Sequence, residues 1–386
     1  MLRQLKNWFH LLQAVAANFR YAFPCRRLRV IGVTGTDGKT TTVHLIYQIL
    51  KVAGRKVDLI STVAAPGLHT TTPATWIIQR LLRQMVDRGV EDVVLEASSH
   101  GLDQNRLWGI DFEIGVVTNV THDHLDYHGS YEGYLEAKTK LIKKAKTAIL
   151  NRDDASYDRL AAKLAAGKVK LQSYGIKKTA DFTPENFSFK TKLPGIYNQY
   201  NCLAAIAVCS VLGIEPSKIR EGVKRFGGVV GRLEEIKGGQ KFAVFVDFAS
   251  TPNSLKNVLQ FLKKRAKRKL WVVFGAAGKR DRQKRPMMGK VASQWADEIV
   301  LTAEDPRGED VNKIIKEITQ GCLTGKKIYK IPDRREAVIF AINQAKKGDV
   351  VVICGKGHEK SMCLNRNEIL WSDQEEARKA IKNRLK

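Results

Sequence analysis

The chain has 386 residues, of which 44% are hydrophobic and 27% are charged. That length and composition predict two or three globular domains and exclude a disordered or low-complexity protein. The 66 Lys and Arg outnumber the 39 Asp and Glu, so the formal net charge is +27, which favours anionic substrates or surfaces as partners.

The first 28 residues form a basic, aromatic extension. Residues 1–30 carry six basic side chains and no acidic one. His10, Gln13 and Asn18 interrupt the apolar stretch, which argues against a signal peptide. Two interpretations remain open: a cationic amphipathic helix that lies on a membrane surface, or a helix that packs its apolar side on the next domain. The packing interpretation is favoured.

Strands and helices alternate through the first half of the chain. The apolar run Leu28–Val33 predicts a buried strand, and a glycine-rich turn and a helix over Thr40–Ala53 follow it. Further strands are predicted at Val93–Glu96, Ile114–Asn119 and Thr147–Asn151, with helices at Thr75–Asp87 and Tyr131–Lys146. This alternation predicts an α/β fold with a mostly parallel, doubly wound sheet.

A second series of strands and helices follows Gly231-Arg232. Strands are predicted at Phe242–Asp247, Leu270–Phe274, Glu298–Thr302 and Val350–Cys354, with helices at Thr251–Lys264, Lys290–Ala296, Val311–Gln320 and Arg334–Lys346. The pattern predicts a Rossmann-like α/β domain. We therefore expect an N-terminal extension (1–28), a P-loop central domain (29–230) and a C-terminal domain (231–386).

Residues 32–41 read Gly-Val-Thr-Gly-Thr-Asp-Gly-Lys-Thr-Thr and lie between a predicted strand and a predicted helix. This is the context of a phosphate-binding P-loop, in which backbone N–H groups face the phosphates. Lys39 can reach the outer phosphates and Thr40 can bind Mg²⁺. The strict pattern has glycine where this chain has Val33, so the motif is a variant.

Two further polar groups follow predicted strands. Glu96 ends one strand, and His124 comes shortly after another. Because ligands of doubly wound sheets bind at the carboxyl ends of strands, we expect Glu96, His124 and the P-loop to converge. A carboxylate and an imidazole near nucleotide phosphates are suited to Mg²⁺.

These motifs resemble those of the Mur ligases, ATP-dependent amide-forming enzymes of cell-wall precursor synthesis. The resemblance covers residues 28 to about 380 and rests on Gly32–Thr41, Glu96–His100, Asp123–His128, Leu193–Ala205, Gly231–Glu234, Asp247–Pro252, Asp281–Pro286, Asp305–Arg307 and Gly355–Glu359. Thr70–Pro73, Asp-Pro-Arg and Gly-Lys-Gly-His-Glu resemble the branch that adds a diamino acid to a muramoyl-dipeptide carboxylate.

The resemblance implies a role for each matching residue. Nucleotide binding falls on Gly35, Thr36, Gly38, Lys39, Thr40, Thr41, Asn198, Asn201, Arg232 and Asp247. Acceptor binding falls on Thr71, Thr72, Ser98, Ser99, Gln104 and Arg106. The implied catalytic group is Lys39, Glu96, His124 and Lys138, and the implied metal ligands are Thr40, Glu96, His124 and Lys138.

Lys138 matches the lysine that is carbamylated in the family. Carbamylation replaces an ammonium by an anion and so creates a metal ligand. Spacing alone would favour a surface lysine on an amphipathic helix, and the resemblance reverses that preference. The expected cofactors are ATP and Mg²⁺, with a carbamate on Lys138.

The incoming amino acid is expected to meet Asp305, Arg307, Gly355 and Glu359. Arg307 offers a planar fork for a carboxylate, and Glu359 can hold a distal ammonium. We therefore favour meso-diaminopimelate over lysine. The family motif for that substrate is Asp-Asn-Pro-Arg, whereas this chain reads Glu304-Asp-Pro-Arg, and the extra acid leaves the choice open.

Three departures from the family pattern stand out. The family has a separate N-terminal domain that binds UDP, and we expect that domain to be absent, because only about 28 residues precede the first strand. Asp37 replaces the usual asparagine of the P-loop, which adds negative charge near phosphates. Ser250 replaces a histidine of the family motif, which affects the expected geometry of the amino-acid pocket.

Alternative functions follow from the same features. A folylpolyglutamate synthetase shares the chemistry, and a non-catalytic nucleotide-binding protein could use a basic surface for nucleic acid or membrane. The twelve basic residues within Lys263–Lys290 lack any accompanying nucleic-acid motif, so we expect no specific nucleic acid. No run of about 18 apolar residues and no Cys-x-x-Cys pair occurs, which predicts reduced thiols in a cytoplasmic protein, with peripheral membrane contact through residues 1–28 as an addition. The oligomeric state is left open.

Overall fold

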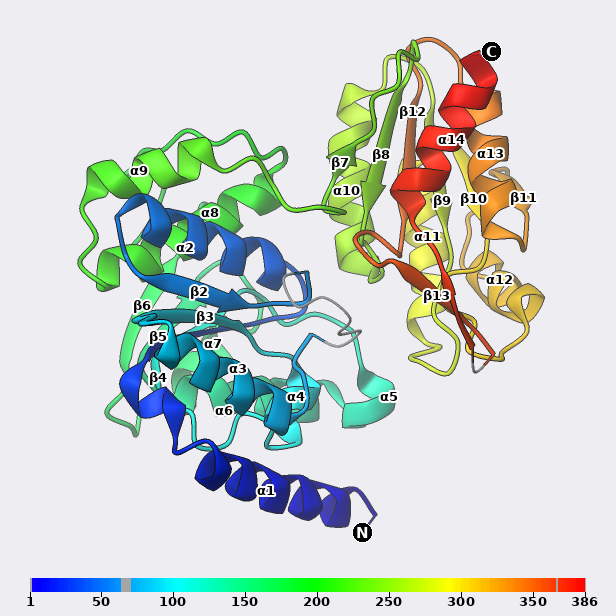
Figure 1. Cartoon of the computed structure of the whole chain (residues 1–386). Helices are drawn as coiled ribbons and strands as arrows, with labels where there is room; N and C mark the ends of the chain where they lie inside the picture. Colours follow the sequence, from blue (N-terminus) through cyan, green and yellow to red (C-terminus); the bar gives the residue numbers. More distant parts are fainter. Residues whose placement is uncertain (1, 64–70, 366, 386) are drawn as a thin grey trace. The chain divides into compact units, whose positions relative to one another are not determined.

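The structure is a computed structural model that describes residues 2–63, 71–365 and 367–385. The chain forms two compact units, which are described separately here (Figure 1). Unit 1 comprises Met1–Thr121 and His128–Gly227, and unit 2 comprises His122–Tyr127 and Gly228–Lys386.

Unit 1 is built on a six-stranded parallel sheet in the order β2-β3-β1-β4-β5-β6. The strands are β1 (Arg29–Thr34), β2 (Val57–Ile60), β3 (Asp92–Glu96), β4 (Phe112–Val117), β5 (Ala145–Asn151) and β6 (Lys170–Tyr174). The central strand β1 is paired on both sides, and its apolar residues are fully buried. Such a strand reads as a continuous hydrophobic run, which is why the sequence predicted it well.

Helices cover both faces of this sheet. Figure 1 shows α2, α8 and α9 on one face and α3, α4 and α6 on the other. Their bounds, with that of the short α7, are α2 (Lys39–Val52), α3 (Thr75–Asp87), α4 (Ser99–Asp103), α6 (Tyr131–Lys143), α7 (Tyr157–Ala162), α8 (Ile196–Val211) and α9 (Pro216–Arg225). The predicted doubly wound architecture is confirmed.

The N-terminal extension is a helix, α1 (Leu2–Arg20), followed by the short 3₁₀ turn Pro24–Arg27. It packs on unit 1 with its small and polar residues. Ala14 and Ala17 are fully buried, and the Asn18 side chain donates to the Trp108 carbonyl at 3.0 Å. The expectation that the apolar side would face the next domain is therefore wrong, because that side is exposed.

Unit 2 contains a six-stranded sheet in the order β11-β10-β9-β12-β8-β7, in which only the edge strand β7 is antiparallel. A separate hairpin pairs β13 with β14. The strands are β7 (Glu234–Glu235), β8 (Ala243–Asp247), β9 (Leu270–Phe274), β10 (Glu298–Leu301), β11 (Lys327–Lys330), β12 (Val350–Cys354), β13 (Ser361–Leu364) and β14 (Asn367–Leu370).

Alternation along the unit 2 strands divides its interior into two cores. Leu270, Val272 and Phe274 pack toward α10 (Pro252–Arg265), α11 (Lys284–Trp295) and α12 (Val311–Thr319). Trp271 and Val273 pack toward α13 (Arg334–Gln344) and α14 (Asp373–Leu385). Two covered faces are what the predicted Rossmann-like arrangement requires.

Helix α11 begins at Lys284, six residues before its predicted start. No helix was predicted over the basic run ahead of that start. In the structure the Arg285 guanidinium is fully buried and donates to Glu309 at 2.7 Å and to Glu317 at 2.6 Å. Acidic partners distant in the sequence therefore allow the basic residues to enter the helix.

All six cysteines are free, and Cys202, Cys209 and Cys354 are fully buried. This agrees with the reduced thiols expected from their spacing. Within the described ranges, no helix is long and apolar enough to cross a membrane.

Candidate active site

The P-loop connects β1 to α2 and depends on two glycines with positive φ, Gly35 (+151°) and Gly38 (+83°). A Cβ atom at Gly35 would lie 1.8 Å from the Thr118 hydroxyl oxygen, and one at Gly38 would lie 2.4 Å from the Asn201 amide oxygen. Neither position can accept a side chain. The glycines therefore let the loop pack closely against Thr118, which follows β4, and against Asn201 of α8. The loop ends at the N-terminus of α2, where backbone N–H groups can bind phosphate.

Lys39 starts α2, and its ammonium donates to the carbonyls of Gly35 (3.0 Å) and Thr36 (2.8 Å). The side chain thus curls over the loop that would receive phosphate. The next residue, Thr40, is buried and donates from its hydroxyl to a Glu96 carboxylate oxygen at 3.0 Å. The structure brings the predicted P-loop and Glu96 together.

Glu96 ends β3 and is almost fully buried. Its second carboxylate oxygen accepts from both the backbone N–H (3.1 Å) and the hydroxyl (3.0 Å) of Thr62. These donors hold the carboxylate in one orientation beside Thr40. Thr62 was not predicted as a site residue, and it follows the edge strand β2, which the sequence analysis also missed.

A hydroxyl and a carboxylate in contact fit Mg²⁺, which takes oxygen ligands and often keeps several waters. Thr40 and Glu96 supply that pair. Within residues 2–63, 71–365 and 367–385, no three His, Cys, Asp or Glu side chains are grouped as a metal site. One hydroxyl and one carboxylate are a ligand pair that suits Mg²⁺ held jointly with phosphate.

Lys138 lies on α6 and is 1% exposed. Its ammonium lies 4.3 Å from the centre of the Tyr134 ring, one turn earlier on the same helix. The Tyr134 hydroxyl in turn lies 3.2 Å from the Thr36 hydroxyl of the P-loop. Tyr134 therefore links Lys138 to the loop, a role that its apolar-looking place in the sequence did not reveal.

The predicted acceptor residues form one network around the end of β3. The Thr72 hydroxyl donates to the Glu96 carbonyl at 3.1 Å and accepts from the Ser98 N–H at 2.8 Å. Arg106 donates to the Thr72 carbonyl at 2.6 Å, and two of its nitrogens donate to the side-chain oxygen of Gln104. Thr71 is half-buried beside this network, and Thr70 lies outside the described residues.

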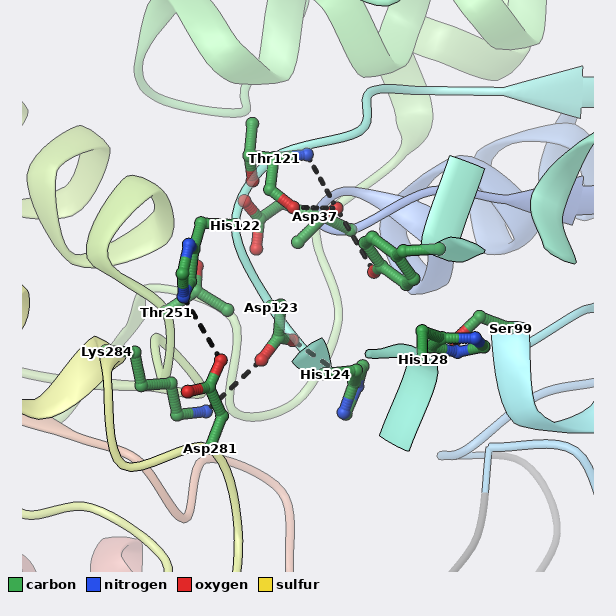
Figure 2. Close-up of polar contacts among 12 residues, drawn as sticks. Asp37, Ser99, Thr121, His122, Asp123, His124, His128, Thr251, Asp281 and Lys284 are labelled. Atoms are coloured by element: carbon green, nitrogen blue, oxygen red, sulfur yellow. Dashed lines mark hydrogen bonds and ion pairs between the residues drawn. The ribbon is translucent and has the colours of Figure 1, made fainter. Parts of the chain in front are cut away.

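Ser99 faces His128, which the sequence analysis left without a role. The Ser99 hydroxyl lies 3.0 Å from the His128 ring nitrogen Nε2 (Figure 2). The His128 ring also lies 5.2 Å from the Tyr134 ring. Contacts therefore run from the acceptor network through His128 to the group around Lys138.

The two asparagines expected near the nucleotide lie on α8. The Asn201 amide donates to the Asn198 side-chain oxygen at 3.0 Å, and Asn198 donates to the Pro194 carbonyl at 2.7 Å. Asn201 is also the residue that abuts Gly38. Asp37, the acidic P-loop residue, is fixed through its backbone, since its N–H donates to the Asn119 side chain at 2.9 Å.

In unit 2, Asp247 ends β8 and shapes the Gly231–Leu233 turn. Its carboxylate accepts from the backbone N–H groups of Leu233 (2.6 Å) and Ala249 (2.7 Å). Leu233 has a positive φ of +50°, so this hydrogen bond holds a strained residue next to Arg232. The Arg232 guanidinium stacks 4.4 Å from the Phe248 ring centre.

The expected amino-acid residues also gather in unit 2. Asp305 accepts from Lys356 (2.7 Å), and the Arg307 guanidinium lies 3.3 Å from its other oxygen. Lys356 also pairs with Glu359 at 2.5 Å, so one buried ammonium joins two of the expected residues. Arg307 has a φ of +51°, a conformation that non-glycine residues rarely adopt outside constrained sites.

Glu304 and Gly355 complete this group. A Cβ atom at Gly355 would lie 3.1 Å from the Glu304 side chain. Burial raises the pKa of Glu304, although the charges of Lys284 and Lys356 oppose the shift. Burial also raises the pKa of Glu359, against the opposing charge of Lys356. Burial therefore opposes ionisation of these two carboxyls, and the neighbouring lysines offset part of that effect.

Residues 122–127 lie between two stretches of unit 1 in the sequence, but they belong to unit 2. His122 lies 3.2 Å from Asp281, and Lys284 donates to Asp123 at 3.4 Å. His124, with a φ of +55°, lies 3.3 Å from the Asp123 carboxylate. The structure thus assigns His124 to a different unit from Thr40, Glu96 and Lys138, whereas the sequence expectation grouped all four.

Two family models match the chain. Residues 33–209 match the Mur ligase middle domain, and residues 231–357 match the Mur ligase, glutamate ligase domain. The first match contains the P-loop, Glu96 and Lys138, and the second contains Asp247, Asp305 and Arg307.

Curated relatives match most of the chain. One is the UDP-N-acetylmuramoyl-L-alanyl-D-glutamate–2,6-diaminopimelate ligase of Geobacillus thermodenitrificans, 41% identical over 96% of this chain and 82% of its own length. The enzyme of the same name from Listeria monocytogenes is 38% identical over 96% of this chain and 82% of its own length.

Solved structures agree in fold. A structure of a UDP-N-acetylmuramoyl-L-alanyl-D-glutamate–2,6-diaminopimelate ligase is 35% identical, with a TM-score of 0.61 over 93% of this chain and 79% of that one. The folylpolyglutamate synthase of Mycobacterium tuberculosis has a TM-score of 0.72 over 89% of this chain and 92% of that one. At 18% identity, the second match shows a shared fold alone.

Proposed function

The chain belongs to the Mur ligase family, and from that premise we propose that it joins a diamino acid to a muramoyl-dipeptide-like carboxylate at the expense of ATP. The observation that carries the proposal is the convergence on one P-loop of Thr40 with Glu96, and of Thr36 with Tyr134 and Lys138. We assign residues 29–230 to the ATP-binding central domain and 231–386 to the C-terminal domain.

ATP would bind at the P-loop of the central domain. Lys39 would turn from its two carbonyls to the outer phosphates, while Thr40 and Glu96 would hold Mg²⁺. When bound, Mg²⁺ supplies positive charge that offsets the charge building on the transferred phosphoryl group. We keep Gly35, Thr36, Gly38, Thr41, Asn198 and Asn201 as nucleotide residues, with Arg232 and Asp247 as the contribution of unit 2.

Lys138 would act as a carbamate. Its amine would add to carbon dioxide with loss of a proton, which turns a buried cation into an anion next to the P-loop. A carbamate at this position would give Mg²⁺ an anionic oxygen ligand, and the metal would balance its charge. His124 would contribute to the same metal, as the family resemblance implies.

The acceptor carboxylate would be presented by the network at the end of β3. Ser98 and Thr72 are fixed by mutual hydrogen bonds, and Arg106 is pre-organised by Gln104. These residues can therefore hold a peptide acceptor without first losing conformational freedom. Ser99 and Thr71 complete the proposed acceptor set.

Arg307 and Glu359 would bind the incoming amino acid. In the structure Arg307 shares Asp305 with Lys356, so a substrate carboxylate would take over one face of a guanidinium that is already oriented. A distal ammonium would meet Glu359 near Gly355. We therefore favour meso-diaminopimelate over lysine, which agrees with the substrate in the names of the curated relatives.

The chemistry then follows from positioning. The acceptor carboxylate attacks the terminal phosphorus of ATP, which releases ADP and forms an acyl phosphate. The neutral amine of the amino acid attacks the acyl carbon, loses a proton and expels phosphate, which leaves the amide. Lys39 steadies the phosphoryl oxygens in the first step, and Arg307 and Glu359 hold the amine donor in the second.

A cytoplasmic location follows from the six free thiols and remains a prediction. Folylpolyglutamate synthesis is the runner-up, since solved synthases share the fold. The chain brings Asp305-Pro-Arg307 and Gly355–Glu359 into contact, which favours the diamino-acid ligase.

Phosphate release with a muramoyl-dipeptide acceptor tests the proposal. Meso-diaminopimelate should support turnover better than lysine at equal concentration, and Arg307→Ala should reduce that preference. Arg280→Ala, which removes a neighbouring cation, serves as the matched control. Better turnover with lysine, or an unchanged preference in Arg307→Ala, would overturn the substrate assignment. Turnover only with a folate acceptor would favour the runner-up.

A further inference from the structure

Helix α1 exposes its apolar face. Leu5, Trp8, Phe9, Leu12 and Phe19 are 58–69% exposed, although each is large and apolar. Their spacing places them on one side of a helix with 3.6 residues per turn. An amphipathic helix of a globular protein normally turns this side inward, whereas α1 turns it toward solvent.

This orientation is fixed by contacts on the opposite side. The Asn7 side chain donates to Asp103 at 3.2 Å, and the Asn18 side chain donates to the Trp108 carbonyl. Ala14 and Ala17 are fully buried between these two points. Because polar side chains and small residues make the contact, rotating α1 to bury its apolar side would leave Asn7 and Asn18 without these partners. The apolar face is thus held outward.

Aromatic rings extend the exposed face past the end of α1. Phe19 meets Phe23 edge to face at 5.2 Å, and Tyr21 meets Trp76 of α3 at 6.5 Å. Trp76 is itself 39% exposed. Tryptophan and tyrosine are the side chains that favour the boundary between water and hydrocarbon.

Cations border this apolar face. Lys6, Arg20, Arg26 and Arg27 are all exposed, and the Arg26 guanidinium lies 4.4 Å from the Phe23 ring centre. No acidic residue occurs within residues 1–30. Asp87 of α3 lies near Arg27, and the exposed cations Lys6, Arg20 and Arg26 remain along the border. A surface that is apolar at its centre and mainly cationic at its border complements an apolar layer covered by negative charge.

We propose that the exposed face of α1 binds the interfacial region of an anionic lipid bilayer, with Leu5, Trp8, Phe9, Leu12 and Phe19 entering the headgroup boundary. A second copy of the chain is a poorer occupant, because two such faces would bring their cations together. The proposal goes beyond ligase chemistry and does not depend on it, since none of these residues belongs to the proposed active site.

Co-sedimentation with vesicles tests the proposal on the full chain. One set of vesicles mixes phosphatidylglycerol with phosphatidylcholine, and the other is phosphatidylcholine alone. The intact chain should bind the anionic vesicles on the order of 10²-fold more tightly at low salt, since each cation near such a surface contributes roughly fivefold. High salt should remove most of that preference.

A triple variant isolates the apolar face. Leu5→Gln, Trp8→Gln and Leu12→Gln together should weaken binding to anionic vesicles at least about tenfold. The matched control is Ile369→Gln with Leu370→Gln, which removes exposed apolar side chains from β14 and should leave vesicle binding unchanged. All five positions are exposed, so neither variant should disturb folding, which circular dichroism can check.

Three outcomes would overturn the proposal. The intact chain could fail to bind anionic vesicles at low salt, or the triple variant could bind as well as the intact chain. Sedimentation equilibrium could instead show a self-associated chain that the triple variant turns into a monomer, which would identify a second copy as the occupant. Phosphate release with a soluble acceptor should be equal in the intact chain and the triple variant, so failure of the ligase assignment remains distinguishable.

Discussion

Lys39 is the residue whose position most directly predicts a catalytic loss. Its ammonium is held by the carbonyls of Gly35 and Thr36, so it is already placed over the phosphate-binding loop. We expect Lys39→Ala to reduce turnover by on the order of 10²–10³, the scale of one pre-organised transition-state contact.

Phosphate release and thermal unfolding together check this loss. Lys51 lies in the last turn of the same helix, at the end opposite to the loop. Lys51→Ala is the control and should keep full turnover. ATP consumption that is unchanged in Lys39→Ala would contradict the assignment of the P-loop.

Lys138 offers a second test at the level of a single residue. Lys138→Ala should lose most activity, because the anion that the carbamate supplies would be missing. A short carboxylate added to the solution should restore part of that activity by occupying the vacated position. Lys140, two residues further along α6 and partly exposed, provides a control substitution.

Mass spectrometry or a solved structure with nucleotide and Mg²⁺ would identify the modification itself. An unmodified ammonium at Lys138 combined with a fully active Lys138→Ala variant would refute the carbamate. The contact of Lys138 with Tyr134 predicts that Tyr134→Phe keeps more activity than Tyr134→Ala, since phenylalanine retains the ring.

At the scale of elements, Arg285 of α11 forms ion pairs with Glu309, which precedes α12, and with Glu317 of α12, and these pairs make unit 2 sensitive to acid. Arg285 donates to Glu309, and this hydrogen bond lowers the pKa of Glu309 to about 2. A carboxyl whose pKa is lower in the folded state stabilises the fold above its unfolded pKa. That stabilisation is lost as the pH falls from about 5 toward 2.

Denaturant unfolding at several pH values checks this dependence. Glu309→Gln should cost roughly 2–3 kcal/mol of unfolding free energy near pH 7 and less near pH 3, where the carboxyl of the unfolded chain is already protonated. The exposed Glu185 serves as the control, since Glu185→Gln should have little effect at either pH. A cost for Glu309→Gln that stays constant with pH would contradict the argument.

The elements that the sequence predicted well are those whose own residues decide their structure. The buried strands β1, β9 and β12 are continuous apolar runs, and α3 begins and ends at its predicted residues. The short edge strands β2 and β11 and the hairpin β13–β14 were missed. Partial burial leaves such strands without a clear pattern, and their pairing depends on residues far away in the chain.

The candidate site was predictable to the extent that short motifs carry it. The P-loop, Glu96 and Lys138 follow from spacing and resemblance, because glycine and lysine are required at fixed offsets. Thr62 and His128 were missed, since a threonine after an edge strand has no distinctive local pattern. Lys356 lies within the Gly-Lys-Gly-His-Glu motif, but its ion pairs with Asp305 and Glu359 were not predicted. The contacts that reveal them are made across the fold.

For the whole molecule, the link after α9 is the most open to attack. Residues 226–231 contain no helix or strand, Gly227 is exposed, and Val230 is 56% exposed. Each unit has its own core, and of unit 2 only residues 122–127 precede this link. Limited proteolysis should therefore cut here and leave fragments close to residues 1–227 and 228–386 that resist further digestion.

Mass spectrometry of the digest identifies the cut, and circular dichroism of the fragments checks that they remain folded. Replacing Gly227 by proline should slow the cut, because proline stiffens the segment that a protease must unfold locally and nothing lies within 4 Å of the Gly227 Cβ position. Rapid loss of either fragment, with no stable intermediate, would contradict the independence of the two cores.

The labelling rates of the buried thiols report how often each unit opens. Cys202 and Cys209 lie within α8 of unit 1, and Cys354 ends β12 of unit 2, so a thiol reagent can reach each only when its surroundings open. Burial raises the pKa of Cys202 to about 11, which further slows its reaction in the closed state. The labelling rate at each cysteine, followed peptide by peptide under native conditions, would then give the opening free energy of unit 1 and of unit 2 within a single intact chain.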